Sequence, residues 1–586
     1  MTDSETTTDG TPTIDPVTLE IVRNACEAIT EEMNANLIRT GYSPNIKERR
    51  DCSCALFDAD GEMISQAENM PVHLGAMPFS VAAAIERYPP ETLEPGDAIL
   101  LNDPFRGGAH LPDLTLVTPV FVKERVVAYA ANRAHHADIG GSRAGSVAAD
   151  STEIYQEGLR IPPIKLYEGG EPNDTAMEMI RANVRTPDER RGDLRAQEAA
   201  NETGRQRFEA LTEKYGTTLL TAALEEIKDY SERRMRAEIE SLPDGIYSFE
   251  DVLDDDGRGA TDLPVATTVT IDDDSIMVDF DGTAEQTAGP VNAVFAVTAS
   301  ATYYAVRCVT DPDIPPNHGC YRPIDISAPA GTIVNPEPPA AVVGGNLETS
   351  QRITDVVLGA LADAATERVL AGCQGTMNNV TFGGTDPRDD SPYAFYETQG
   401  GGFGGRAGID GMDGVHVHMS NTMNTPVEVL ETVYPLRVMR YELRNNSGGA
   451  GEFRGGLGLR RDIGVRKHSA AFSLLADRHR HEPYGLAGGS EGGSGVAYLF
   501  ENGLDEGTST SDSDRERLPG KVVRELTPGS VVSIRTPGAG GYGEPEERDP
   551  EAIARDIKLG KVSTEAARER YGFSDATFDD IDLDAP

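Results

Sequence analysis

Residues 114–136 read LTLVTPVFVKERVVAYAANRAHH, two runs rich in β-branched and apolar residues separated by three charged ones. Such runs predict the two strands of a hairpin, and the charged segment Lys123–Arg125 predicts its turn. With Glu124 at the centre of the turn, Asp113 and His135 lie at equal distances from it. The pattern therefore predicts that Asp113 and His135 face one another across the two strands.

The end of this hairpin collects groups that bind metal ions. Opposed residues have Cβ atoms about 4.5–5.5 Å apart, so both side chains can reach one ion. His110 precedes Asp113 by three residues and follows two glycines. Two imidazoles and one carboxylate leave coordination positions open, which is typical of a catalytic rather than a structural site. The sequence thus predicts one divalent ion (zinc, manganese or iron) on His110, Asp113 and His135; the alternative is idle histidines at a sheet edge.

Two residues after the hairpin are expected to support this site. Side chains alternate along a strand, so His136 is predicted to point away from His135 unless a bulge intervenes. It would then support the ligands, contact substrate or simply pack. Asp138 could orient His135 through its free ring nitrogen.

Residues nearer the N-terminus are candidates for substrate binding. Glu48, Arg49 and Asp51 precede a predicted strand. Paired carboxylates and guanidinium groups suit a polar or phosphorylated substrate, although an ordinary salt-bridged loop has the same composition. His73 lies in a predicted loop flanked by proline and glycine, where a single histidine is more often structural.

Motifs for nucleotide binding and for a catalytic nucleophile are weak or missing, which favours metal-assisted chemistry instead. Gly400, Gly402 and Gly405 form G-x-G-x-x-G, but no helical pattern follows them. The sequence has neither a P-loop nor a G-x-S-x-G nucleophile motif. His416 and His418 alternate on a predicted strand without an evident third ligand, which indicates packing or a pocket wall.

The whole chain reads as a strand-rich α+β protein. Asp15 and Pro16 begin a predicted N-terminal helix, and a further helical stretch covers about 175–241. Strands are expected to about 334 and again over 426–536, whereas 340–470 is glycine-rich with little periodicity. We expect a multi-lobed mixed α/β chain with a short helical C-terminus, not a doubly wound Rossmann sheet. The predicted units are a disordered acidic tail (1–14), a metal-bearing domain (15–240), a strand-rich domain (241–340), a glycine-rich mixed domain with strands (341–545), and C-terminal short helices and tail (546–586).

Composition limits the classes of molecule that the chain is expected to bind and indicates the conditions in which it works. The formal charge is −44, from 97 acidic and 53 basic residues. Such a surface repels nucleic acid and anionic membranes, and excess acid with few lysines favours adaptation to high salt. The sequence has neither an apolar run long enough to span a membrane nor a secretory signal, so we expect a cytoplasmic protein. Its six cysteines are expected to be reduced, without disulfides.

Motifs along almost the whole chain resemble the hydantoinase B/oxoprolinase family. They include KERRDCSCALFDADGEMISQAENMPVHLGAMP, GDAILLNDPFRGGAHLPDLTLVTPVF and NRAHHADIGG, and later DGTAEQTAGPVNA, NTMNTPVEVLE, GGAGEFRGGLGLRRD and TPGAGGYGEP. The family comprises B subunits of ATP-dependent hydantoinases, the C-terminal half of 5-oxoprolinases and a subunit of acetone carboxylases.

The resemblance implies a division of labour between two chains. An A-type ATPase partner would bind ATP and phosphorylate a small cyclic amide of the hydantoin or 5-oxoproline class. This chain would then open the ring by metal-assisted hydrolysis in a hetero-oligomer, as a cyclic amide hydrolase. The family's metal set falls on the same three residues as the hairpin argument. His136 or Asp138 would assist proton transfer, and Arg49, Arg50 or Arg106 would bind phosphate.

Two alternatives remain open at this point. An acetone-carboxylase-like subunit would use the same ligands for the ATP-dependent carboxylation of a ketone, with a small third chain. A non-enzymatic chain that only stabilises its A-type partner would bind no metal.

Overall fold

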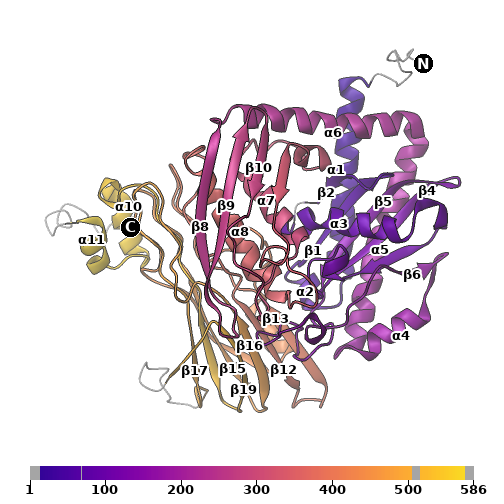
Figure 1. Ribbon diagram of the computed structural model, residues 1–586. Helices are drawn as coiled ribbons and strands as arrows, with labels where there is room; N and C mark the ends of the chain where they lie inside the picture. Colours follow the sequence, from indigo (N-terminus) through magenta and orange to yellow (C-terminus); the bar gives the residue numbers. More distant parts are fainter. Residues whose placement is uncertain (1–13, 68, 505–514, 574–586) are drawn as a thin grey trace.

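A computed structural model describes residues 14–67, 69–504 and 515–573 (Figure 1). The predicted acidic tail, apart from Ile14, lies outside the described residues, as do the last residues of the predicted C-terminal tail. The described residues form four open sheets with helices between and around them, which confirms the strand-rich mixed α/β class.

The largest sheet contains the predicted hairpin. Its strand order is β2-β1-β5-β4-β3-β6-β7, and every neighbouring pair is antiparallel, which excludes a doubly wound Rossmann sheet. Its strands are β1 (Cys52–Asp58), β2 (Met63–Gln66), β3 (Ala98–Leu101), β4 (Asp113–Val122), β5 (Arg125–His135), β6 (Ile164–Glu168) and β7 (Glu171–Pro172).

Helices cover both faces of this sheet. One face packs on α1 (Pro16–Thr40), α5 (Pro187–Tyr215) and α6 (Thr217–Glu240), which with Ala128, Ala130 and Ala134 enclose an apolar cluster. The other face carries α3 (Pro71–Arg87). As predicted, Asp15 caps the N-terminus of α1, and its carboxylate accepts hydrogen bonds from the backbone N–H groups of Val17 and Thr18. The helical stretch near 175–241 is α4 (Asp174–Ala182), α5 and α6.

The hairpin has the predicted register at the site and a different turn. Asp113 pairs with His135, as expected. The turn has two residues instead of three, with Lys123 in the left-handed region (φ 58°). Val120 pairs with Ala128 and Phe121 with Val126, so Val127 is an extra residue, a bulge. The bulge offsets the shorter turn and restores the predicted pairing.

The remaining sheets form the second half of the molecule. Beside the first sheet, β11-β10-β9-β8 packs on α7 (Phe295–Val309) and α8 (Ser350–Leu361). Its strands are β8 (Gly245–Asp255), β9 (Thr261–Asp272), β10 (Ser275–Asp279) and β11 (Ile324–Ser327). A third sheet, β13-β12-β16-β19, contains β12 (Asn379–Thr385), β13 (Pro392–Glu397), β16 (Ala470–Leu475) and β19 (Lys521–Leu526). A fourth, β14-β15-β20-β17-β18, contains β14 (Leu436–Leu443), β15 (Leu459–Val465), β17 (Val496–Phe500), β18 (Glu516–Leu518) and β20 (Val531–Arg535).

The glycine-rich middle of the chain is more regular than its sequence indicates. It holds α8, a π-helical turn η5 (Gly345–Thr349) before it, β12 and β13, and α9 (Val427–Val433). Its glycines let main chain pack on main chain. A Cβ at Gly404 would lie 1.9 Å from the carbonyl oxygen of Ala371, and one at Gly538 would lie 1.8 Å from that of Ser447.

Two short helices, α10 (Pro550–Lys558) and α11 (Thr564–Tyr571), close the described chain as predicted. All six cysteines are free thiols, also as predicted. Within the described ranges, no helix combines the length and apolar character needed to cross a membrane.

Candidate metal centre

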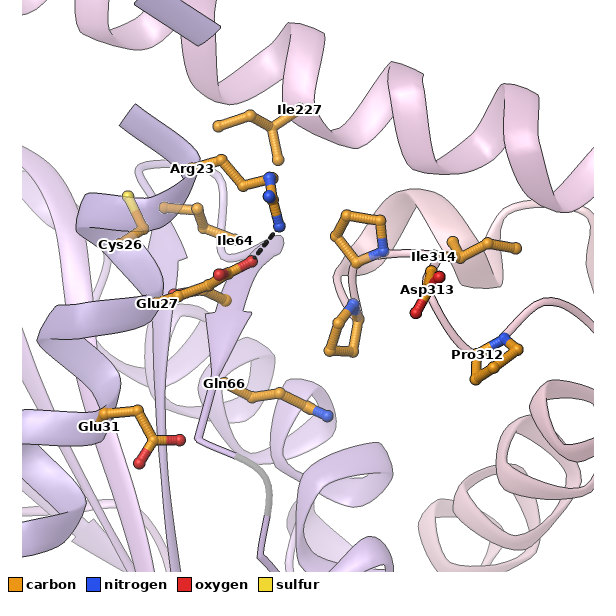
Figure 2. Close-up of a pocket in the computed structure, with 13 residues that line it drawn as sticks. Arg23, Cys26, Glu27, Glu31, Ile64, Gln66, Ile227, Pro312, Asp313 and Ile314 are labelled. Carbon is orange, nitrogen blue, oxygen red and sulfur yellow. Dashed lines mark hydrogen bonds and ion pairs between the residues drawn. The ribbon is translucent and has the colours of Figure 1, made fainter. Parts of the chain in front are cut away.

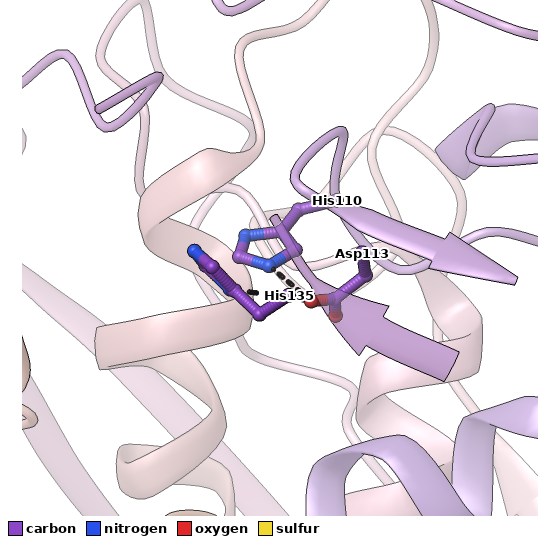
Figure 3. A group of neighbouring side chains, drawn as sticks. All are labelled: His110, Asp113 and His135. Carbon is purple, nitrogen blue, oxygen red and sulfur yellow. Dashed lines mark ion pairs between the residues drawn. The ribbon is translucent and has the colours of Figure 1, made fainter. Parts of the chain in front are cut away.

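Three ligand-type side chains meet at the end of the hairpin (Figure 3). Asp113 is the first residue of β4, His135 is the last of β5, and His110 reaches back from the loop before β4. One Asp113 carboxylate oxygen, Oδ1, lies 2.9 Å from His110 Nε2 and 3.3 Å from His135 Nδ1. The structure therefore brings together the three residues that the hairpin register selected.

These groups are buried and lack the hydrogen bonds that buried polar atoms normally make. His110 and Asp113 are fully buried and His135 is 2% exposed. Apart from the close contacts of Asp113 with His110 and His135, both His110 ring nitrogens, both Asp113 oxygens and His135 Nε2 have no hydrogen-bond partner. Buried polar atoms are almost always paired, so a converging set of unpaired donors and acceptors fits a cation held between them.

The electrostatics agree with a ligand set. Burial alone would raise the pKa of the Asp113 carboxyl, but His110 and His73 outweigh it and hold this pKa well below its usual range. Burial lowers the pKa of His135, against the opposing effect of Asp51 and Asp113. A carboxylate and a neutral imidazole are the protonation states in which these side chains bind metal.

His73 belongs to this group, which its sequence context did not show. It lies in the first turn of α3, not in a loop, and is 1% exposed. Its Nε2 is 3.4 Å from Asp113 Oδ1 and 3.8 Å from Asp51 Oδ1. The backbone carbonyl of Asp51 accepts a hydrogen bond from the His135 N–H, which ties this aspartate to the hairpin.

Arg133 also lies on this face and was missed by the sequence argument. It is two residues before His135, so its side chain points to the same face of the sheet. Its guanidinium donates to Thr115 Oγ1 (2.8 Å) and Ser80 Oγ (2.7 Å), fastening α3 to the hairpin. The alternation that placed His135 could have identified it.

Arg49, a predicted phosphate ligand, is buried and links segments of this chain to one another. It is 1% exposed and bonds within the protein. Its Nη2 donates to Thr398 (2.6 Å) and Thr422 (3.2 Å), far along the chain. Its ion pair with Asp51 is long, at 3.9 Å.

Glu48 and Arg106, two further candidates for substrate binding, lie outside the cluster. Glu48 ends the short helix α2 (Pro44–Lys47) and is half-buried. Arg106 belongs to a short 3-10 turn (Pro104–Arg106), is 63% exposed and pairs with Asp103 at 3.7 Å. The structure does not bring either residue to Asp113.

His136 points to the opposite face of the sheet, as its position in the strand predicted. Its Nε2 pairs with Gln197 of α5 at 2.9 Å. Burial, helped by Arg190, lowers the pKa of His136 to about 4, so it is neutral near pH 7. It therefore packs behind the hairpin, on the face opposite the Asp113 carboxylate.

Asp138 does not orient His135 as expected. Its carboxylate accepts from the N–H groups of Gly140, Gly145 and Arg185 and forms a 2.9 Å ion pair with the Arg185 guanidinium. The acceptor capacity of Asp138 is thus used in ordering the loop after β5.

His416 and His418 do not form a comparable ligand cluster. His416 and His418 lie in an irregular segment, not on the predicted strand. His416 Nδ1 pairs with Ser420 at 2.9 Å, and His418 Nε2 lies 3.5 Å from Asp355.

Asp58, Glu62 and Glu225 also cluster, but Asp58 and Glu62 are only partly buried and Glu225 is exposed. The ammonium of Lys228 already lies among them, 2.7 Å from Asp58 and from Glu225. This ammonium supplies the positive charge that the three carboxylates need.

Two hollows lie near α3 and α1. The larger, about 860 Å³, is lined by Pro71, Leu74 and Gly75, from the turn of α3 that carries His73. The smaller, about 330 Å³, lies between α1, β2 and the 312–316 segment, where Arg23 pairs with Glu27 (Figure 2). The larger has the volume of a small-molecule site.

Comparison with known proteins places the chain in a family. The model of the family described as hydantoinase B/oxoprolinase matches residues 15–545. The chain belongs to the hydantoinase B/oxoprolinase family. This confirms the resemblance that its motifs indicated.

Individual relatives differ in how much of their length this chain spans. It is 42% identical to the protein MJ0963 of Methanocaldococcus jannaschii, over 95% of this chain and 96% of that one. It is 35% identical to a protein of Pseudomonas sp. (strain NS671) named as the B subunit of a D-/L-hydantoinase, over 97% of each. It is 38% identical to 5-oxoprolinase 1 of Arabidopsis thaliana over 90% of this chain, which spans only 42% of the plant protein.

Two solved structures share the architecture. The ATP-dependent caprolactamase from Pseudomonas jessenii matches with a TM-score of 0.89 and 31% identity, over 98% of both chains. Nucleotide-free acetone carboxylase matches with a TM-score of 0.86 and 20% identity, over 95% of this chain and 79% of that one. The latter likeness shows a common fold alone.

Proposed function

We propose that this chain is the metal-bearing subunit of an ATP-dependent cyclic amide hydrolase. An A-type ATPase partner phosphorylates a ring of the hydantoin or 5-oxoproline class, and this chain catalyses hydrolytic opening. The observation that carries the proposal is the buried group of His110, Asp113 and His135, whose ligand atoms converge on one another and of which most have no hydrogen-bond partner outside the group. The family membership and the names of its relatives support the choice of substrate class.

The site's own residues define the chemistry. A divalent cation bound there supplies Lewis acidity, which acidifies water and polarises a carbonyl oxygen. Asp113 provides the negative charge, and His110 and His135 provide imidazole nitrogens. His73 lies between Asp113 and Asp51, and this histidine and Asp51 move the proton as water adds to the activated ring carbon. The ring C–N bond then breaks as the nitrogen takes up a proton, which leaves an acyl phosphate. A second water hydrolyses this acyl phosphate to a carboxylate and inorganic phosphate.

The greater length of some relatives supports a separate partner chain. This chain corresponds to 42% of 5-oxoprolinase 1. We propose that a separate A-type chain supplies the ATP-binding part and that the two form a hetero-oligomer. The hollow lined by the His73-bearing turn of α3 is our proposed approach for the substrate.

Metal content and turnover together test this proposal. Elemental analysis should find one equivalent of metal in the wild type and none in His110→Ala or His135→Ala. The matched control is His481→Ala, because His481 is partly exposed and pairs with Asp262 far from the cluster in sequence. The two site variants should remain folded and lose ATP-dependent ring opening with the partner.

The substrate panel decides between neighbouring reactions. It contains hydantoin, 5-oxoproline and caprolactam, and acetone with bicarbonate as the carboxylase alternative, each with ATP and the partner. If acetone with bicarbonate gave product and none of the cyclic amides did, the hydrolase assignment would be overturned. Metal-free wild-type protein that opens a cyclic amide at full rate would overturn the metal-assisted mechanism.

A further inference from the structure

The imidazole ring of His135 packs against an aromatic ring from the other half of the molecule. The Tyr396 ring, on β13, stacks on the His135 imidazole with centroids 4.5 Å apart and planes 7° from parallel. The χ2 torsion, which sets the plane of a histidine ring, has a broad preferred range, so the residues packed around the ring determine its value. A flat ring lying parallel restricts that rotation directly.

Tyr396 is itself fixed from several directions. Its hydroxyl donates to Asn379 Oδ1 at 3.1 Å. The Asn379 amide donates in turn to Glu348 (2.7 Å) and to the Leu475 carbonyl (2.9 Å). The Arg49 guanidinium carbon lies 5.1 Å from the ring centre, and Arg49 Nη1 donates to the Tyr396 carbonyl at 3.3 Å. The ring is therefore anchored within the third sheet and tied to the N-terminal half.

The backbone of His135 is equally constrained. Asn45 Nδ2 donates to its carbonyl at 2.6 Å, and its N–H donates to the Asp51 carbonyl at 3.0 Å. With the backbone fixed by these bonds, the remaining freedom of this side chain is its two torsions, χ1 and the χ2 that sets the ring plane. Tyr396 is the described residue that stacks against that plane.

We propose that Tyr396 is a positioning residue for metal binding, which presets the imidazole plane of His135 by stacking. The inference rests on the proposed metal site and extends it to a residue outside the ligand set. Groups that orient metal ligands contribute strongly to affinity because they remove the cost of ordering the ligand. The metal site thereby depends on β13, a strand of a different sheet.

Titration of metal into apo-protein tests the proposal without any assay of turnover. Tyr396→Leu removes the flat ring, and Tyr396→Met removes it while retaining unbranched apolar bulk. Tyr396→Phe keeps the ring and loses only the bond to Asn379. The matched controls are Tyr393→Leu and Tyr393→Phe in the same strand, since the Tyr393 hydroxyl pairs with His468 and not with the cluster.

The expected readouts are the Kd for Co²⁺ and the visible spectrum of the bound ion. Leu and Met at 396 should weaken binding roughly 10–100-fold and alter the spectrum, while Phe stays within about threefold of wild type. The Tyr393 variants should bind as wild type does, even where they lower the free energy of unfolding.

Wild-type affinity and spectrum in folded Tyr396→Met would overturn the positioning role and leave the metal site standing. Affinity loss in Tyr393→Leu equal to that in Tyr396→Leu would also overturn it, because general destabilisation would then account for the effect. A wild type that binds no Co²⁺, like His110→Ala, would overturn the proposed function together with this inference.

Discussion

Replacing Glu348 by glutamine tests how the polar groups behind Tyr396 respond to pH. Glu348 is fully buried in the π-helical turn η5 and accepts hydrogen bonds from the Asn379 amide and the Met377 N–H. Burial raises the pKa of Glu348 to about 8; Thr376 and Lys521 oppose this shift and Asp477 adds to it. Near pH 7 the side chain is therefore mostly a neutral acid, and glutamine imitates its shape and can accept the same two bonds.

The sign and size of the effect follow from proton linkage. A carboxyl whose pKa is raised in the folded protein contributes stability that is present below the unfolded value and is lost as pH rises through the folded value. With 4.5 for the unfolded chain and about 8 for the folded one, the loss between about pH 5 and pH 9 is about 4 kcal/mol. Glutamine does not titrate, so Glu348→Gln lacks this contribution.

The assay is denaturant unfolding at constant salt from about pH 5 to pH 9, followed by circular dichroism. The difference in unfolding free energy between wild type and Glu348→Gln isolates this residue, because every other titrating group is common to both. The variant should gain about 4 kcal/mol relative to wild type over this range. Parallel profiles would refute the assignment of Glu348 as a buried neutral acid.

Two further predictions concern buried and surface charge. Arg461→Met should lower the unfolding free energy by about 3–5 kcal/mol, because it leaves the buried Glu397 carboxylate, now 2.5 Å from Arg461 Nη1, without its cation. Arg233→Met, which removes an exposed pair with Glu226, should cost less than about 1 kcal/mol, and equal losses would contradict the argument. Because acidic residues outnumber basic ones by 97 to 53, the Tm should rise steadily from about 0.1 M to about 3 M KCl as counterions screen self-repulsion, and a flat Tm would contradict the expected adaptation to salt.

The hairpin shows what local sequence pattern can predict. Strand alternation and distance from Glu124 sufficed to pair Asp113 with His135 and to turn His136 away. The pairing was right although the turn was not, because the bulge at Val127 offset the missing turn residue. Register near a buried site is set by which face must be covered, and that signal is present in the sequence.

Long-range partners account for most of what the pattern missed. Nothing near Arg49 in the sequence indicates its hydrogen bonds to Thr398 and Thr422, which lie 349 and 373 residues further along the chain. His73 was assigned to a loop because Pro71 and Gly75 flank it, yet Pro71 starts the helix and Gly75 packs closely on Ser300. Tyr396 gave no signal at all, since its role depends on contact with a residue in another sheet.

The glycines at which main chain packs on main chain, such as Gly404 and Gly538, form a glycine-rich layer that limits where sequences of this family can vary. Where carbonyl oxygens such as that of Ala371 occupy the place of a Cβ, no side chain of any chemistry can be accommodated at Gly404 without moving another segment. A saturation library across 397–414 should therefore recover almost exclusively glycine at such positions, whichever substrate is used for selection. New specificities would have to arise in the loops and strands around this layer, which would persist as an invariant frame while its surroundings diverge.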